Sequence, residues 1–98
     1  MKNFRTYQLA LELPRECLTH RWPNYMKDQA LRASLSVCLN LAEGFGKPMG
    51  KDRARFYNIA MGSLRELQCC LEIHGTPVAR TLADQTGAHL YKLTKAFH

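Results

Sequence analysis

A turn rich in glycine and proline divides the chain into two long helical segments, and this division constrains the fold most. The turn, residues 44–50, reads GFGKPMG. On both sides of it apolar and small residues recur at alternating spacings of four and three, which predicts two amphipathic helices folded back as a hairpin. The predicted seam consists of Leu31, Leu35, Cys38, Ala42 and Phe45 before the turn, and Phe56, Ala60, Ser63, Leu67, Cys70 and His74 after it.

Helical spacing continues outside this hairpin, and the alternation typical of strands is not found. We expect helices over residues 6–19, 26–43, 51–74 and 78–97, the first of them kinked at Pro14 because proline lacks a backbone N–H. Short turns at residues 21–24 and 75–77 separate the outer helices from the hairpin. The sequence therefore predicts an all-α fold, an antiparallel up-down-up-down four-helix bundle, with all 98 residues in one domain.

The chain is basic, with 14 Lys and Arg against 8 Asp and Glu and a net charge of +6. This balance favours a polyanionic partner, nucleic acid first and an anionic membrane surface second. The alternative is a solvated basic surface with no particular partner. The first residues carry charges throughout and no apolar run reaches the length of a membrane span, so we expect a cytoplasmic protein without a secretory signal and without a role at the membrane.

The central turn concentrates positive charge. Lys47, Lys51, Arg53 and Arg55 follow one another closely, opposed only by Asp52. Three of these cations begin the third helix, whose first N–H groups could help to bind a phosphate. These four residues are therefore the candidate nucleic-acid contacts, and the patch could be extended by Arg21 and Lys27, with Arg5 and Arg15 as further possibilities. The alternative is a solvated loop whose cations pair with nearby acids.

Charged residues of the hairpin are expected to pair across it. A hairpin centred on Pro48 places Glu43 opposite Arg55 and Arg32 opposite Glu66, which predicts two ion pairs between the helices. The two glutamates could also be considered as a catalytic pair. More than roughly 15 Å of axial rise separates them in this register, so structural pairing is the better interpretation.

Small polar residues of the hairpin receive a structural interpretation as well. Gly62 and Ser63 fall near Ser36, and we expect them to let the two backbones approach closely. Asn40, near the end of the second helix, belongs to the same set.

Metal binding and covalent catalysis find little support. Cys17 and His20, and likewise Cys70 and His74, are one helical turn apart, but no CxxC pair and no Glu-x-x-His motif accompanies them. Neither a Ser-His-Asp arrangement nor a phosphate-binding loop ending in GK[ST] is present. Adjacent residues on a helix point about 100° apart, so Cys69 and Cys70 suit a disulfide framework poorly. We expect no metal, no cofactor and buried free thiols.

Three segments resemble a known family: residues 29–36 (QALRASLS), 40–44 (NLAEG) and 56–67 (FYNIAMGSLREL). They are similar to the bacterial four-helix-bundle proteins whose best-known members are encoded by intervening sequences of large-subunit ribosomal RNA genes. The matching motif positions are Arg32, Ser36, Asn40, Glu43, Gly44, Gly62, Ser63 and Glu66. One departure concerns Cys38, which stands where the family usually has proline.

The resemblance implies a bundle that assembles into a homopentameric barrel. Related accessory proteins of diversity-generating retroelements share this architecture and bind nucleic acid and a reverse transcriptase, and no enzyme is implied. The leading hypothesis is thus a non-enzymatic, oligomeric protein that binds RNA or an RNA–DNA hybrid through backbone electrostatics, since an aromatic platform of the RRM kind is lacking. The alternative is an oligomeric protein-interaction scaffold, in which surface residues such as Tyr7, Trp22 and Tyr91 would matter more than the cations. A small enzyme comes third, because it lacks a candidate catalytic constellation.

Overall fold

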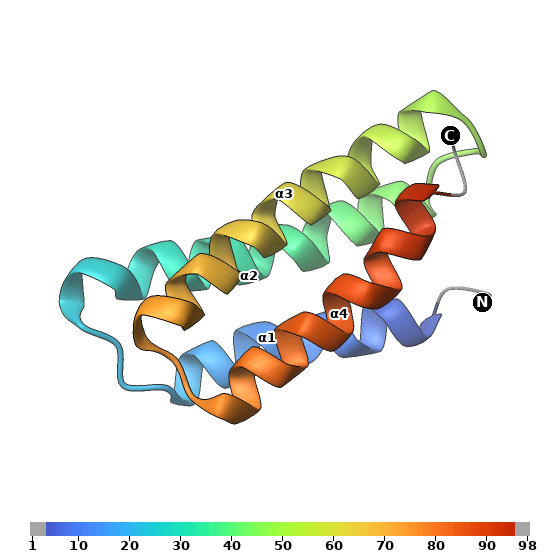
Figure 1. Ribbon diagram of the computed structural model, residues 1–98. Helices are drawn as coiled ribbons and strands as arrows, with labels where there is room; N and C mark the ends of the chain where they lie inside the picture. Colours follow the sequence, from blue (N-terminus) through green and yellow to red (C-terminus); the bar gives the residue numbers. More distant parts are fainter. Residues whose placement is uncertain (1–3, 96–98) are drawn as a thin grey trace.

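The computed structural model describes residues 4–95, which form four helices and no strand (Figure 1). The helices are α1 (Phe4–Thr19), α2 (Asn24–Phe45), α3 (Lys51–His74) and α4 (Pro77–Lys95). The predicted all-α four-helix bundle is confirmed, and the bounds of α3 agree to the residue. The predicted end of the fourth helix, at residue 97, lies outside the described residues.

Each helix runs antiparallel to the next, and α4 returns to pack against α1, so the four form a closed square (Figure 1). The bundle measures 40 × 20 × 20 Å. Because the helices alternate in direction, one end of the bundle collects the start of α1, the α2–α3 turn and the end of α4. The opposite end collects the α1–α2 and α3–α4 turns.

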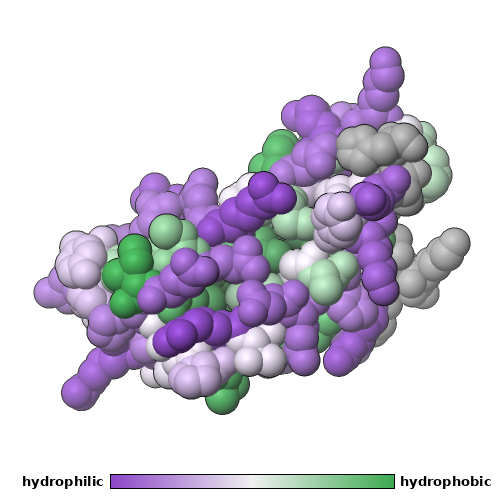
Figure 2. All heavy atoms as spheres, in the orientation of Figure 1, coloured by the Kyte–Doolittle hydropathy of each residue, from purple (hydrophilic) through white to green (hydrophobic). Residues whose placement is uncertain are grey.

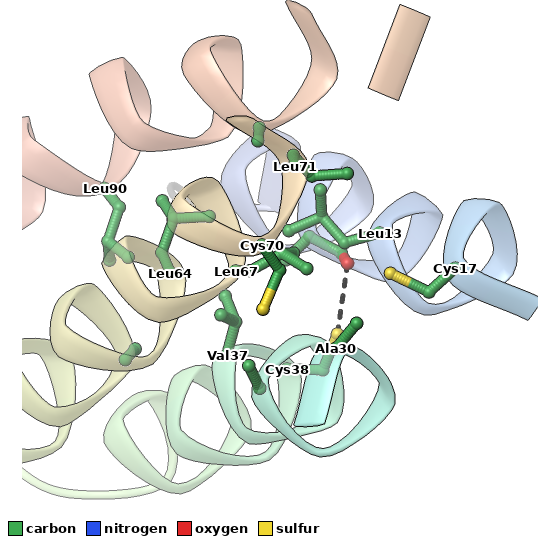
Figure 3. Packing of buried hydrophobic residues seen from close by; sticks show 14 of the residues in the cluster. Leu13, Cys17, Ala30, Val37, Cys38, Leu64, Leu67, Cys70, Leu71 and Leu90 are labelled. Atoms are coloured by element: carbon green, nitrogen blue, oxygen red, sulfur yellow. Dashed lines mark hydrogen bonds between the residues drawn. The ribbon is translucent and has the colours of Figure 1, made fainter. Parts of the chain in front are cut away.

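The core consists mainly of leucine and alanine side chains from all four helices, together with Val37 and three cysteines (Figure 3). Leu41, Leu64, Leu67 and Leu90 are fully buried, and each such side chain stabilises the fold by about 1.5–3 kcal/mol. Outside the core, the face formed by α3 and α4 is mostly hydrophilic with small apolar areas (Figure 2).

The predicted seam of α2 is partly wrong. Leu35 and Ala42 are exposed, whereas Ala33, Val37 and Leu41 are buried. A heptad pattern describes contact with a single partner helix. In the square bundle α2 packs against both α1 and α3, so its buried arc is wider and centred elsewhere.

Pro14 lies within α1, which continues across it to Thr19. Proline has no N–H to donate to the carbonyl four residues earlier, which here belongs to Ala10. The Cys38 thiol donates to that carbonyl from α2, at 3.1 Å (Figure 3). The cysteine at the family's usual proline position therefore satisfies the acceptor that Pro14 leaves without its helical donor.

Close approach of α2 and α3 depends on Gly44. A Cβ atom there would lie 2.6 Å from Cε1 of Tyr57, a distance at which one of the two side chains must move. The prediction that Gly62 serves this purpose is wrong, since Gly62 is exposed and a Cβ added to it would meet no atom within 4 Å. Near the turn, the ring of Tyr57 therefore packs directly against the backbone of α2 at Gly44.

The four cysteines are free thiols, as expected, but only Cys17, Cys38 and Cys70 are buried. Burial raises the pKa of the Cys17 and Cys70 thiols and raises that of Cys38 to about 11. Cys69 is exposed, contrary to the expectation that all four are buried. Within residues 4–95, none of the helices combines the length and apolar character needed to cross a bilayer.

Candidate nucleic-acid interface

Cations from three helices and a turn gather at one end of the bundle, which we call the basic end. It is defined by Arg5 of α1, Lys47 of the α2–α3 turn, Lys51, Arg53 and Arg55 of α3, and Lys92 and Lys95 of α4. The antiparallel topology brings these residues together although they come from opposite parts of the sequence (Figure 1). Asp52 and Glu43 are the acids of the hairpin at this end, so positive charge predominates there.

Lys47 and Arg55 flank the ring of Phe56. The Lys47 ammonium lies 5.5 Å from the ring centroid and the Arg55 guanidinium carbon 4.6 Å from it, both within cation–π range. Arg55 also donates to the Asp52 carboxylate at 3.1 Å. Both partners of this ion pair are more than half exposed, so it adds little to stability. The ring positions both cations, of which Arg55 is exposed and Lys47 half-buried.

Arg53, predicted as a nucleic-acid contact, is instead a structural residue. Its Nε donates to the carbonyls of Gly44 and Lys47, both at 2.9 Å, and one Nη donates to the Phe45 carbonyl at 3.1 Å. The last carbonyls of a helix lack helical partners, and a cation near them is favoured by the helix dipole. Arg53 therefore closes the C-terminus of α2 and fixes the turn that carries Lys47.

Lys51 begins α3 and is exposed. It follows Gly50, whose φ of 133° lies in the region that favours glycine. No side chain caps the first N–H groups of α3. The turn thus presents Lys51 at a helix start with positive dipole potential.

Lys92 and Lys95, which sequence reasoning missed as candidate contacts, belong to the basic end. They occupy the last turn of α4, where cations complement the negative end of the dipole. The Lys95 ammonium lies 5.2 Å from the ring centroid of Tyr91, itself 50% exposed. The only sequence signal for this grouping is the up-down topology, which places the end of α4 beside the central turn.

Arg21 and Lys27, predicted to extend the patch, lie at the opposite end of the bundle. Arg21 is in the α1–α2 turn and Lys27 in the first turn of α2. At 1.5 Å per residue, Lys27 is about 27 Å along α2 from the basic end. Both side chains are exposed, but the structure does not place them on one surface with the turn cations.

The opposite end is closed by three aromatic side chains, and we call it the histidine end: His20, Trp22 and His74. His20 Nε2 lies 2.9 Å from the His74 carbonyl and 3.1 Å from His74 Nδ1. Since a carbonyl only accepts, Nε2 carries the proton. Trp22 packs edge-on against His20 with centroids 4.4 Å apart and donates from Nε1 to the Cys17 carbonyl at 2.9 Å. Trp22 is therefore a buried residue and not the surface residue that the scaffold hypothesis assumed.

The two ion pairs predicted between α2 and α3 are not formed among residues 4–95. Arg55 pairs with Asp52 of its own helix and not with Glu43, because side chains three residues apart on a helix lie next to each other. Glu66 accepts from Gln29 Nε2 at 3.1 Å and not from Arg32.

A pair of serine hydroxyls joins α2 and α3, and Asn40 supports it from within α2. The hydroxyl oxygens of Ser36 and Ser63 are 2.6 Å apart. Asn40 Nδ2 donates to the Ser36 carbonyl at 2.8 Å and lies 3.1 Å from its hydroxyl. The Ser36–Ser63 and Gln29–Glu66 hydrogen bonds thus link the two helices of the hairpin, and the predicted ion pairs do not.

Metal-ligating groups stay dispersed. In the part of the chain that the structure describes, no three His, Cys, Asp or Glu side chains come together as a metal would require. His20 and His74 meet only as a pair, and their nitrogens serve the contacts described above.

The fold and the basic end define a class: small, basic, antiparallel four-helix bundles whose cations gather where the central hairpin turns. Comparison with family models gives a match to the 23S rRNA-intervening sequence protein family over residues 2–97. Since the match spans nearly the whole chain, the protein belongs to that family. A comparison with individual curated proteins finds no match.

Proposed function

We propose that this protein is a non-enzymatic nucleic-acid-binding protein that contacts the phosphate backbone through its basic end. The observation that carries this proposal is the convergence of Lys47, Lys51 and Arg55 with Lys92 and Lys95 at one end of the bundle. Flexible, exposed cations bind phosphates by releasing counterions from the nucleic acid, without reading sequence. RNA, or an RNA–DNA hybrid, is the proposed natural ligand.

Self-association would strengthen this activity. The family resemblance implies a homopentamer, and exposed apolar side chains on α2, Leu35 (49%) and Leu39 (64%), offer surface for contact between copies. A ring repeats the basic end around one axis, so several weak phosphate sites act together. Light scattering tests the assembly: five chains of 11.2 kDa are expected, and a stable monomer would contradict it.

A reverse transcriptase is a further proposed partner, by the resemblance to retroelement accessory proteins. The genetic context tests this role directly. A neighbouring reverse-transcriptase gene supports it, whereas location inside a ribosomal RNA gene supports the intervening-sequence role.

Salt-dependent binding tests the central proposal. Fluorescence anisotropy with a labelled 20-nucleotide RNA between 50 and 300 mM salt should show affinity falling steeply as salt rises. The triple variant K47Q/K51Q/R55Q should bind at least about 10-fold more weakly, with the slope of log K against log salt reduced by about 2, since each single-strand phosphate contact contributes roughly 0.7. Arg53 is left intact because it holds α2.

The control variant R21Q/K27Q/R32Q removes the same amount of charge outside the basic end. It should bind within about 3-fold of the unaltered protein, since these cations lie far from the proposed contacts. Salt-insensitive binding, or equal losses in both triple variants, would contradict the proposal.

The second candidate function is an oligomeric interaction scaffold for which nucleic acid is incidental. The exposure of Leu35 and Leu39, one turn apart on α2, favours it, because contiguous exposed apolar patches mark sites of protein contact. A pulldown that survives nuclease and high salt, and that is lost in L35S/L39S, would favour the scaffold.

A further inference from the structure

Two aromatic rings lie beneath cations at the basic end, and the two rings differ in how far the rest of the fold packs against them. Phe56 is partly buried, with Lys47 and Arg55 over its ring and its Cβ close to Gly44. Packing between the turn and α3 accounts for this ring. Tyr91 is 50% exposed and outside the hydrophobic core, while its neighbours Leu90 and Leu93 are buried. The fold alone gives no reason for a large ring at position 91.

The register of α3 against α4 places Tyr91 relative to the turn cations. Gln68 Nε2 donates to Asp84 at 3.2 Å, and Gly87 lies beside Leu64. Continued along the two helices, this alignment sets Tyr91 level with Met61. Arg55 then lies about 9 Å and Lys51 about 15 Å further along the axis. At 3.4 Å per step, about four stacked nucleotides cover that distance.

The cation beside Tyr91 matches the chemistry of a nucleotide. The Lys95 ammonium is 5.2 Å from the ring centroid, and its flexible stem lets it move from the ring to a phosphate one nucleotide away. A base has an apolar π face that stacks on an aromatic ring whatever its sequence. Ring and cation together therefore suit a base and its phosphate.

We infer that Tyr91 is a base-stacking platform and that the basic end binds single-stranded nucleic acid in preference to duplex. In this arrangement one unpaired base stacks on Tyr91, Lys95 contacts the adjacent phosphate, and Arg55 and Lys51 contact phosphates further along the strand. In a duplex each base is already stacked between its neighbours, so Tyr91 gains nothing from it. The inference rests on the proposed function and names its ligand class more narrowly.

The test compares two variants on three ligands. Y91F keeps the ring, whereas Y91L keeps apolar bulk without a π face. Each is titrated with a 12-nucleotide RNA, the same sequence as DNA, and a 12-base-pair duplex at fixed salt. Y91L should lose about 5- to 100-fold in affinity for both single strands and less than about 2-fold for the duplex, while Y91F stays within about 2-fold throughout. Y25L, at the most exposed tyrosine of the opposite end (79%), should change none of the three.

Unaltered single-strand binding by Y91L, on RNA or on DNA, would overturn the inference, and so would an equal loss on single strands and duplex. Both outcomes leave phosphate binding by the basic end intact. Failure of the unaltered protein to bind any of the three ligands would instead overturn the proposed function. Circular dichroism and thermal unfolding should be unchanged in Y91L, because the side chain lies outside the core.

Discussion

Both ends of the bundle carry cations and aromatic rings, yet the two ends use them differently. At the histidine end, His20, Trp22 and His74 contact one another and backbone carbonyls, so their polar groups close the bundle. At the basic end, Arg53 is used in this way, because it donates to backbone carbonyls of α2 and of the turn. Lys47, Arg55 and Lys95 lie on ring faces that a ligand can share. Charge alone therefore does not mark a binding surface; what matters is whether the fold already uses the charged group.

The largest expected effect separates the structural cation of the basic end from its neighbours. R53Q removes charge-assisted hydrogen bonds to three carbonyls and should lower the free energy of unfolding by about 2–3 kcal/mol. For a domain of this size that corresponds to a fall in Tm of roughly 10–20 °C. Urea denaturation measures the change directly.

The matched control is R55Q, two residues further along α3. Arg55 forms an exposed ion pair and an exposed contact with the Phe56 ring, so stability should change by less than about 0.5 kcal/mol. Equal destabilisation by the two substitutions would break the distinction between a structural and an accessible cation.

The next largest effect on stability is expected in the middle of the bundle, at Cys38. C38A removes the thiol that satisfies the Ala10 carbonyl beside Pro14 and should destabilise the fold by about 1–2 kcal/mol. The control is C69A, at an exposed position of α3, which should be nearly neutral for stability.

Alkaline pH offers a second readout of the same thiol. Burial raises the pKa of Cys38 to about 11, above its value of about 8.5 in the unfolded chain. The stability that comes from the protonated thiol is therefore fully present below about pH 8.5 and is lost as pH rises toward 11. Part of this alkaline loss should disappear in C38A, and an unchanged profile would contradict the burial of the thiol.

The smallest effect is expected at the histidine end. H20A removes the hydrogen bond to the His74 carbonyl and the edge contact with Trp22, and should lower stability by about 1 kcal/mol. Tryptophan fluorescence should shift to longer wavelength as Trp22 becomes more hydrated. RNA affinity should stay within about 2-fold, and a larger loss would show that the two ends are not independent.

The sequence predicted the helices well, because their apolar spacing and the breaks at residues 20–23, 46–50 and 75–76 are local signals. It placed the seam of α2 wrongly, because contact with two neighbouring helices is a property of the whole bundle. It grouped Lys47, Lys51 and Arg55 with Arg53 as candidate contacts and could not separate Arg53 from the other three. That distinction depends on carbonyls of α2 and of the turn that only the folded turn brings within reach of Arg53.

Residues distant in sequence escaped prediction for the same reason. Lys92, Lys95 and Tyr91 join the basic end through the return of α4, while Arg21 and Lys27 are carried to the far end. The predicted ion pairs of Glu43 and Glu66 followed from register alone. The register determines which residues of α2 and α3 lie opposite each other. It does not determine whether a charged side chain bonds to the residue opposite or to another neighbour, such as Asp52 or Gln29.

The most direct test of the account locates the nucleic acid on the protein. A 12-nucleotide RNA containing 4-thiouridine, crosslinked to the unaltered protein and analysed by mass spectrometry, reports which residues lie against it. The account predicts crosslinks in the peptides that contain Lys47 to Phe56 and Tyr91 to Lys95, suppressed by raised salt. Crosslinks centred on the α1–α2 turn and the histidine end, or spread evenly over the bundle, would contradict it.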